Sequence, residues 1–267
     1  KLDETIISKA IVDSFSEKLK KSLQTDVVIA GAGPAGLVAA YYLARKKVKV
    51  VLFERKLSIG GGIWGGGIMF NKIVVQKKAR HILDEFKINL KLYQKGYYLA
   101  DAVEVASTLC SKTAKAGVEI FNLMSVEDVM IRHQRVSGVV INWSAVDIAG
   151  FHVDPIAVRA KFTIDATGHG SELAKVVEKK MGVALNTETG RVLGEKPMWA
   201  EVGEEAILTN TAEIFPNLYV AGMAANAVYG APRMGPIFGG MLLSGEKAAG
   251  LVAKRLNKKI FGKISEN

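Results

Sequence analysis

The sequence predicts an α/β fold built on a doubly wound, largely parallel sheet. Three observations indicate it: a dinucleotide-binding fingerprint near the start of the chain, short apolar runs that alternate with helical stretches, and a lack of repeats, low-complexity segments and linkers. With 267 residues, of which 49% are hydrophobic and 23% charged, the composition is typical of a well-packed protein. We therefore expect one α/β domain over residues 1–267.

The strongest signal is a strand–turn–helix–strand pattern near the start of the chain. The apolar run 27–30 suits a strand that is buried on both faces. The helical stretch 35–47 follows Pro34, a residue that is common at the first helical position. A second apolar run lies at 48–53. We expect the whole nucleotide-binding unit to span residues 24–70.

Three glycines in the turn of this unit indicate what it binds. Gly31, Gly33 and Gly36 have G-x-G-x-x-G spacing. The first permits a tight turn, the second lets backbone approach a pyrophosphate, and the third lets the helix pack closely on the strand. The helix start offers free N–H groups and a partial positive charge to phosphates. Glu54, after the second strand, is suited to accept hydrogen bonds from a ribose diol, so we predict an ADP-containing ligand.

A second glycine cluster, GGGIWGGG, occupies residues 60–67. So many glycines forgo side-chain packing, which is typical either of a flexible loop or of backbone held against a ligand. Because the cluster directly follows the ribose-binding acid, we favour the second interpretation, with Trp64 as an apolar wall.

Apolar periodicity predicts the remaining elements. An amphipathic helix over residues 3–23 is expected to pack its apolar face on a partner surface that the sequence does not identify. Cys110 lies on the apolar face of a predicted helix and is expected to be a buried core thiol. Residues 183–211 show no regular pattern. The other predicted elements are helices at 72–87, 101–116, 172–180 and 238–256, strands at 118–121, 125–131, 136–143, 161–165 and 218–222, and a small additional pair of strands at 90–99.

The net charge of +10 has two interpretations. The lysines are scattered over helical stretches, as on solvated helix faces, and no nucleic-acid recognition motif accompanies them, so we expect no nucleic-acid partner. A basic surface that attracts an anionic dinucleotide is the milder alternative. No apolar run reaches the roughly 20 residues that span a bilayer, so we expect no membrane partner. A single cysteine excludes an intrachain disulfide, which fits a cytoplasmic location.

The layout resembles the glutathione-reductase-like flavoprotein fold, in which an Ala-Thr-Gly segment and a late strand ending in Gly-Asp join the fingerprint. Here residues 166–168 are Ala-Thr-Gly, but Met223 follows the late strand in place of the acid. A thioether cannot hold a ribityl chain and pyrophosphate as a carboxylate does. The chain also lacks a second G-x-G-x-x-G for a nicotinamide cofactor. A flavin-dependent oxidoreductase of the same broad fold therefore remains the alternative function.

A set of further motifs resembles the thiamine thiazole synthase family across nearly the whole chain. The motifs are GGGIWGGG at 60–67, VEDV at 126–129, GVVINW at 138–143, HVDP at 152–155, ATGH at 166–169 and RMGPIFGGMLLSG at 233–245. The resemblance implies that NAD is a substrate and not a redox carrier. Nicotinamide is lost, the ribose opens to a ketone that condenses with glycine, and added sulfur gives an ADP-linked thiazole carboxylate, the thiazole precursor of thiamine.

One residue departs from the pattern of the fungal and plant members. Those members have a cysteine two residues before the aspartate of the D-P pair, and it gives up its own sulfur, so each molecule turns over once. This chain has His152 at that position, and an imidazole has no sulfur to donate. The sequence therefore resembles the archaeal-type branch, which uses external sulfide. His152 is expected either to shuttle protons near neutral pH or to fill the vacated position and touch the nucleotide.

The resemblance implies roles for three further residues. Asp154 and His169 are the candidate Fe(II) ligands, since carboxylate and imidazole suit ferrous iron and leave positions open for substrate. The metal would act as a Lewis acid and hold sulfide beside the carbon that it attacks. Arg233 is expected to clamp the glycine carboxylate bidentately. With His152, these residues make up the predicted catalytic set.

The resemblance also extends to nucleotide contacts and assembly. The family forms ring-like octamers, in which the segment that matches His152 and Asp154 reaches into a neighbour's site, and we expect the same homo-octamer here. The expected small-molecule partners are NAD, glycine and sulfide. The fingerprint and the resemblance together assign the dinucleotide contacts to Gly31, Ala32, Gly33, Gly36, Glu54, Arg55, Gly61, Gly62, Val126, His152, Val153, Asp154 and Met223.

Overall fold

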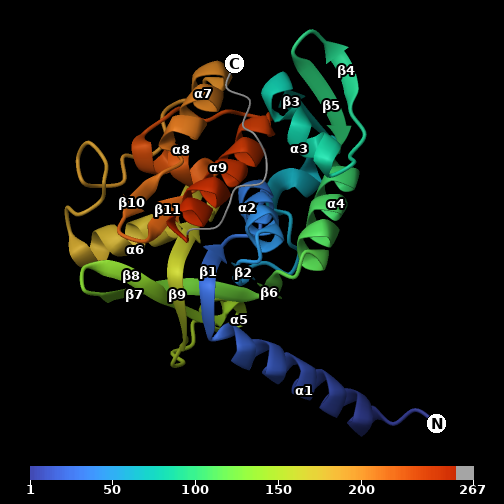
Figure 1. Ribbon diagram of the computed structural model, residues 1–267, viewed down its shortest axis with the longest axis vertical. Helices are drawn as coiled ribbons and strands as arrows, with labels where there is room; N and C mark the ends of the chain where they lie inside the picture. The colour runs from blue at the N-terminus through green and yellow to red at the C-terminus, as the bar shows by residue number, and fades with distance from the viewer. Residues whose placement is uncertain (257–267) are drawn as a thin grey trace.

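The computed structural model describes residues 1–256, and residues 257–267 of the predicted domain lie outside the described residues. Its central sheet consists of β1 (Gln24–Ala30), β2 (Val50–Glu54), β6 (Glu119–Asn122), β7 (Met124–Arg132), β8 (Arg135–Trp143), β9 (Ile156–Asp165), β10 (Glu213–Phe215) and β11 (Leu218–Val220). The order is β10-β11-β9-β1-β2-β6, and β8 and β7 extend from β9 (Figure 1). Neighbours from β11 to β6 pair in parallel, which confirms the predicted fold class.

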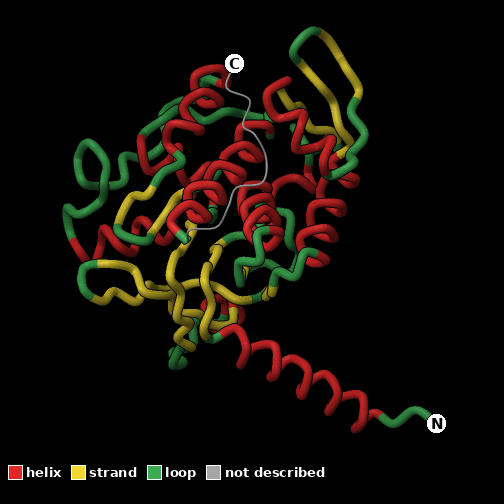
Figure 2. Tube along the Cα trace, viewed as in Figure 1, coloured by secondary structure: helices red, strands yellow, loops and turns green. Residues whose placement is uncertain are grey.

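Helices occupy more of the described chain than strands do, and Figure 2 shows how most of them gather around the sheet. Among residues 1–256, no helix is both long and apolar enough to cross a membrane. The helices are α1 (Glu4–Ser22), α2 (Pro34–Arg45), α3 (Arg80–Glu85), α4 (Ala102–Lys115), α5 (Ser144–Ile148), α6 (Glu172–Met181), α7 (Ala200–Asn210), α8 (Met223–Tyr229) and α9 (Gly239–Arg255).

Alternate residues of β1 pack into two different cores. Val27 and Ile29 belong to the cluster that α2, α4 and α9 cover, whereas Val28 and Ala30 belong to the cluster under β7, β8 and α6. Successive side chains of a strand point to opposite faces of the sheet, so a strand that is covered on both faces has no polar position. This explains why residues 27–30 of β1 form a continuous apolar run and not an alternating pattern.

A small antiparallel sheet lies apart from the central one, at the upper right of Figure 1. It contains β3 (Lys72–Gln76), β4 (Lys91–Gln94) and β5 (Tyr97–Asp101) in the order β3-β5-β4. The turn between β4 and β5 confirms the predicted strand pair. The predicted helix after it is confirmed as α4, which begins because the side chain of Asp101 accepts hydrogen bonds from the N–H groups of Val103 and Glu104.

Two predictions of secondary structure were wrong. The segment 72–87 was expected to be one helix, but it begins as β3 and becomes helical only at α3. The segment 183–211 was expected to be irregular, but it contains α7. Only Gly203 and Ile207 of α7 are buried, so this helix shows too few apolar positions to give a periodic signal.

The predicted helix over residues 3–23 forms as α1, but most of it does not pack on this chain. Near its end, the ring of Phe15 meets the edge of Phe121, with 5.9 Å between the ring centroids. Towards the N-terminus the helix extends away from the body of the protein (Figures 1 and 2), and Ile6 and Ile11 are 67% and 64% exposed. A packing partner for this part of α1 therefore stays a prediction.

Candidate functional site

The carboxyl ends of the parallel strands surround a cavity of about 920 Å³. Its walls come from the turn after β1, residues 54–56 at the end of β2, residues 166–170 after β9 and Gly222 after β11. Ligands of open α/β sheets bind outside the carboxyl ends of the strands, so the cavity has the position that the fold predicts for a nucleotide.

The three fingerprint glycines have three different environments. Gly31 has a φ of +98°, which only glycine adopts readily, and it makes the tight turn. A Cβ on Gly36 would lie 2.0 Å from the carbonyl oxygen of Gly31, so the helix packs directly on the turn. A Cβ on Gly33 would meet nothing within 4 Å and would point into open space beside the start of α2. Gly33 is thus the position where a pyrophosphate has room to approach the backbone.

Glu54 ties the first turn to the end of the second strand. One carboxylate oxygen accepts a hydrogen bond from the N–H of Ala32 at 2.9 Å, and the other accepts one from the N–H of Lys56 at 2.9 Å. Ala32 itself is fully buried and does not line the cavity, whereas Glu54 and Arg55 do. The guanidinium of Arg55 pairs with Glu172 at 2.5 Å.

The second glycine cluster lies against the fingerprint. The N–H of Gly60 donates to the carbonyl of Ala32 at 2.8 Å, and Gly61 and Gly62 line the cavity. A Cβ on Gly61 would come within 2.9 Å of the Cα of Gly33, so the two loops need glycine to touch. The prediction of Trp64 as a cavity wall was wrong, because its indole N–H donates to the carbonyl of Ile59 and its ring is not among the cavity residues.

Two more predicted contacts line the cavity from other strands. Val126 lies near the start of β7, and Met223 opens α8 directly after β11. Gly222, before the methionine, has a φ of +66°, and its N–H donates to the hydroxyl of Ser244 at 2.7 Å. The late strand therefore leads into the cavity, as it was expected to do, with an apolar thioether at its end.

His169 and Arg233 line the same cavity and share a carboxylate that the sequence did not suggest. Both oxygens of Glu195 lie within hydrogen-bonding distance of Nδ1 of His169, at 2.7 and 2.9 Å. One of them is also 3.9 Å from Nε of Arg233. A carboxylate accepts hydrogen bonds, so Nδ1 of His169 carries a hydrogen, and in the neutral imidazole Nε2 is the nitrogen with the lone pair. The side chain of Glu195 is 15% exposed and that of His169 is 53% exposed, so the imidazole faces the cavity from a buried support.

The local backbone explains why these three side chains meet. The segment around Lys196 pairs with the segment around Pro232, and the N–H of Trp199 donates to the carbonyl of Arg233 at 2.9 Å. This pairing holds Glu195 beside Arg233 although the two are far apart in sequence. No residue pattern near Glu195 indicates this contact.

Asp165, the last residue of β9, fixes the loop that carries His169. Its carboxylate is fully buried and accepts hydrogen bonds from the N–H and hydroxyl groups of Thr167 and from the N–H groups of Leu173 and Ala174. Burial raises the pKa of Asp165, and these hydrogen bonds oppose that change. An acid at the end of an apolar run, just before Ala-Thr-Gly, is the signal from which this residue could have been found.

The other predicted catalytic residues lie elsewhere. His152, Val153 and Asp154 are exposed in the loop before β9 and do not line the cavity, whereas His169 follows the end of β9. A strand rises about 3.3 Å per residue, so β9 holds Asp154 and His169 at opposite ends of a strand roughly 30 Å long. Within residues 1–256, no three His, Cys, Asp or Glu side chains gather as a metal site. One chain does not bring the candidate iron ligands together.

Comparisons with known proteins point to one family. The family model described as "Thi4 family" matches residues 8–238. Thiamine thiazole synthases from Methanothermobacter thermautotrophicus and Pyrococcus abyssi are 61% and 57% identical, and each match covers 96% of this chain and 99% of the relative. The crystal structure of Thermovibrio ammonificans THI4 is 52% identical and aligns with a TM-score of 0.93 over 96% of this chain and 99% of that one.

A more distant solved structure shares the fold alone. The geranylgeranyl bacteriochlorophyll reductase-like protein of Thermoplasma acidophilum is 15% identical and aligns with a TM-score of 0.52 over 88% of this chain and 80% of that one.

Proposed function

Because the chain belongs to the Thi4 family, we propose that it is a thiamine thiazole synthase that converts NAD, glycine and sulfide, with Fe(II), to an ADP-linked thiazole carboxylate and nicotinamide. The observation that carries the proposal is the meeting of the nucleotide fingerprint, His169 and Arg233 around one cavity. A redox enzyme would use the dinucleotide as a hydride carrier. In this protein, the cavity at the fingerprint also contains side chains that are suited to bind an amino acid beside the dinucleotide.

The ADP half of NAD binds along the fingerprint. Gly33 and the start of α2 receive the pyrophosphate, because the N–H groups and the dipole of the helix favour negative charge there. Glu54 accepts hydrogen bonds from the adenosine ribose with the lone pairs that its two backbone contacts leave free. This arrangement orients the second ribose, which undergoes the chemistry, towards the His169 side of the cavity.

Arg233 binds the carboxylate of glycine. Its side chain is 59% exposed and lines the cavity, and Glu195 at 3.9 Å is close enough to orient the guanidinium without a tight ion pair. A planar guanidinium can therefore offer two parallel N–H donors to an incoming carboxylate. Binding in this way leaves the amino group of glycine free to condense with the opened ribose.

His169 has the environment of a metal ligand. Histidines that bind metals usually donate the other ring N–H to a carboxylate, and Glu195 accepts that hydrogen here. The free Nε2 and a carboxylate from Asp154 would form a donor set that suits Fe(II). A bound ferrous ion supplies Lewis-acid chemistry and leaves positions for substrate. Asp154 of the same chain is too far away to join His169, so the donor set fits only if Asp154 comes from a second copy.

Two observations support an assembly with shared sites. The exposed loop that carries Asp154 projects from the end of β9 remote from the cavity. The apolar residues Ile6, Ile11 and Val12 of α1 are exposed on a helix that extends away from the body. A large apolar surface of this kind is typical of a protein–protein contact. We propose a homo-octamer in which each cavity is completed by a neighbour's His152–Asp154 segment.

The sulfur comes from outside the protein. Cys110 is half-buried in α4, and burial raises the pKa of its thiol to about 11, so it stays a protonated, unreactive thiol. His152 occupies the position of the donor cysteine in other members and has no sulfur. It either transfers protons in the completed site or fills space beside the nucleotide.

The test is an anaerobic incubation of the full-length protein with NAD, glycine, Fe(II) and sulfide, followed by mass analysis of the product and of the protein. We expect ADP-thiazole carboxylate and free nicotinamide, more than one product per chain, and an unchanged protein mass. Omission of each component in turn is the control. Return of NAD as NADH, or loss of one sulfur from the protein, would contradict the proposal. A bound-flavin absorbance spectrum would favour the alternative oxidoreductase.

A further inference from the structure

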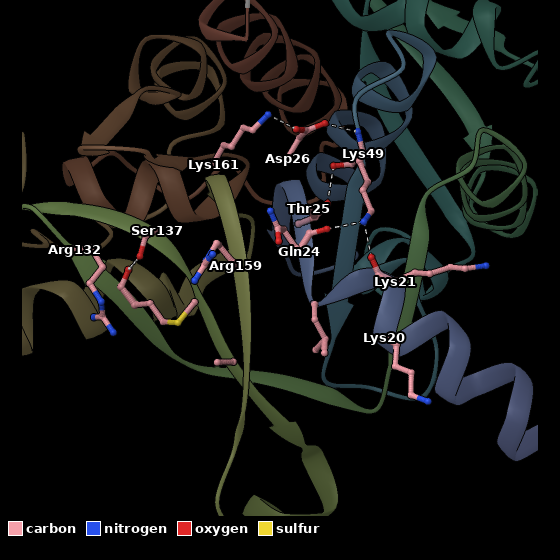
Figure 3. Close-up of a pocket in the computed structure, with 13 residues that line it drawn as sticks. Lys20, Lys21, Gln24, Thr25, Asp26, Lys49, Arg132, Ser137, Arg159 and Lys161 are labelled. Atoms are coloured by element: carbon pink, nitrogen blue, oxygen red, sulfur yellow. Dashed lines mark hydrogen bonds and ion pairs between the residues drawn. The ribbon is translucent and has the colours of Figure 1, made fainter.

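A second cavity, of about 990 Å³, lies at the amino ends of the parallel strands, whereas the candidate site lies at their carboxyl ends. Figure 3 shows the residues that line it. They come from the end of α1, the amino ends of β1 and β9, the residue before β2, and the hairpin of β7 and β8. The volume is in the range of small-molecule sites, roughly 300–1,000 Å³. Neither the dinucleotide fingerprint nor any predicted catalytic residue contributes to it.

The lining is strongly basic. Its charged side chains are those of Lys20, Lys21, Asp26, Lys49, Arg132, Arg159 and Lys161, so a single carboxylate stands against six cations. Lys161 forms an ion pair with the carboxylate of Asp26 at 2.8 Å, and Lys21 forms one at 2.6 Å with Glu17, which lies outside the cavity. Four cations therefore have no carboxylate partner among residues 1–256.

The four unpaired cations lie on two sides of the cavity. Arg132 and Arg159 come from β7 and β9 on one side, and Lys20 and Lys49 come from the α1–β2 side (Figure 3). The ammonium group of Lys49 is held by the carbonyl oxygens of Lys21 and Gln24, at 2.5 and 2.6 Å, which fixes its position without neutralising it. The cavity thus presents positive charge from both walls.

A glycine lies between the two strands that carry the arginines. In the register of the sheet, Gly138 of β8 lies between Met130 of β7 and Arg159 of β9. A Cβ at this position would come within 2.4 Å of the Met130 side chain and 2.9 Å of the Cα of Arg159. The side chain of Met130 therefore covers Gly138, and Met130 lines the cavity together with Ser137 of β8, Arg132 and Arg159.

From these contacts we propose that the cavity binds a small polyphosphate anion, that is, a metabolite with a pyrophosphate or triphosphate group. Cations gathered without counter-charges repel one another, and a multiply charged anion between the two walls removes that repulsion. Two guanidinium groups match phosphate oxygens bidentately, and the lysines add point charges on the other side. Among residues 1–256, no aromatic side chain lines the cavity, so stacking on nucleic-acid bases has no platform in this part of the chain.

The proposal is tested by calorimetric titration of the full-length protein with inorganic triphosphate, which lacks the adenosine that the fingerprint recognises. We expect one saturable site per chain, which saturating NAD does not displace, with an affinity that falls as salt is raised. The double variant Arg132→Gln, Arg159→Gln should bind at least about tenfold more weakly, since two bidentate contacts are lost. The matched control is Lys91→Gln, Lys95→Gln, which removes two charges from the exposed β4–β5 hairpin and should change nothing.

Three results would overturn the proposal: no saturable binding, equal losses in the double variant and its control, or displacement of triphosphate by NAD. Displacement by a short oligonucleotide at lower concentration than triphosphate would assign the surface to nucleic acid instead. Thermal unfolding of each variant shows whether the fold is retained. Lys20→Gln, at the exposed end of α1 and outside the sheet, provides a second variant that should weaken triphosphate binding even if the double variant is unstable.

Discussion

Glu195 holds Nδ1 of His169 with both of its carboxylate oxygens, at 2.7 and 2.9 Å, and thereby leaves Nε2 of the imidazole free towards the cavity. The two residues are far apart in sequence, and only the fold brings them together. His169 follows the end of β9 at the cavity, and the pairing of segment 195–199 with segment 231–233 places Glu195 beside it. The carboxylate therefore determines which ring nitrogen of His169 is available to a ligand.

The first prediction concerns this contact. Glu195→Gln should weaken Fe(II) binding roughly 10- to 100-fold, because the amide is a poorer acceptor for the imidazole N–H and no longer fixes the ring orientation. Anaerobic metal titration measures the affinity, and nitrogen NMR of His169 in the metal-free protein reports the tautomer. Glu188→Gln, in an exposed loop, is the control. An unchanged tautomer and unchanged metal affinity would show that Glu195 serves only the local fold.

The second prediction concerns the separation of Asp154 and His169 along β9. Asp154→Ala and His169→Ala should each abolish product formation while NAD binding is retained. Chains of the two variants, co-expressed so that they assemble together, should regain about one quarter of wild-type activity, because random mixing pairs an intact Asp154 with an intact His169 in that fraction of sites. Assemblies of two different Asp154 variants should remain inactive. Inactive mixed assemblies would argue against sites shared between subunits.

The third prediction concerns the only cysteine. Cys110→Ala should leave product formation with sulfide nearly unchanged and should cost no more than about 1 kcal/mol of stability, because the half-buried thiol only borders the core. Product yield and urea unfolding measure the two effects. A folded but inactive Cys110→Ala protein would place the sulfur source inside the chain and end the case for external sulfide.

The fourth prediction separates two fingerprint glycines. Gly36→Ala should destabilise the protein by about 1–3 kcal/mol, because the new methyl group meets the Gly31 carbonyl in a packed region. Gly33→Ala should leave stability unchanged, since nothing lies within 4 Å of its Cβ, but it should weaken NAD binding where the pyrophosphate approaches. Chemical unfolding and NAD titration are the two measurements. Equal effects of both substitutions on stability would mean that the space beside Gly33 is structural.

The fifth prediction follows from a buried acid that the proposed reaction does not use. Glu204 of α7 accepts hydrogen bonds from the N–H of Gly240 at 2.8 Å and from the side chain of Gln76. Burial raises the pKa of Glu204 to about 7 from its ordinary 4.5. Between pH 4.5 and about pH 7, the carboxyl group of Glu204 is therefore protonated in the folded protein but ionised in the unfolded chain. Stability should fall as pH rises from about 4.5 to about 7, by roughly 3 kcal/mol in total, and then level off.

Urea unfolding of wild-type protein and of Glu204→Gln between about pH 5 and about pH 8 measures this effect. The amide keeps the shape of a protonated carboxyl group, so the variant should lose this part of the pH dependence and be the more stable protein at the alkaline end. Its N–H groups can also serve the buried side-chain oxygen of Gln76, which has no hydrogen-bond partner among residues 1–256. Glu205→Gln, on the exposed side of α7, is the control. Parallel pH profiles for wild type and Glu204→Gln would contradict the assignment.

Elements that depend on interactions between residues close in sequence were predicted accurately, and elements that depend on distant residues were not. The turn at Gly31, the close packing at Gly36 and the cap at Asp101 act over a few residues, so the β1–α2 unit and α4 were predicted near their true bounds. Segment 72–87 failed because buried residues from Val75 to Phe86 also follow helical spacing, which hides a five-residue strand at its start. Pairing with β5, a non-local contact, decides that Lys72–Gln76 is a strand.

By itself, the sequence determined the tight glycine turn at Gly31–Gly36 and the absence of a sulfur atom at position 152, because both depend on residue identity and short-range sterics. Only the tertiary structure decided which side chains share a cavity. Long-range backbone pairing places Glu195 within hydrogen-bonding distance of His169, and β9 separates His169 from Asp154 by its full length. The rise of a strand is fixed by covalent geometry, but which of its ends meets which distant segment depends on contacts that no local pattern encodes.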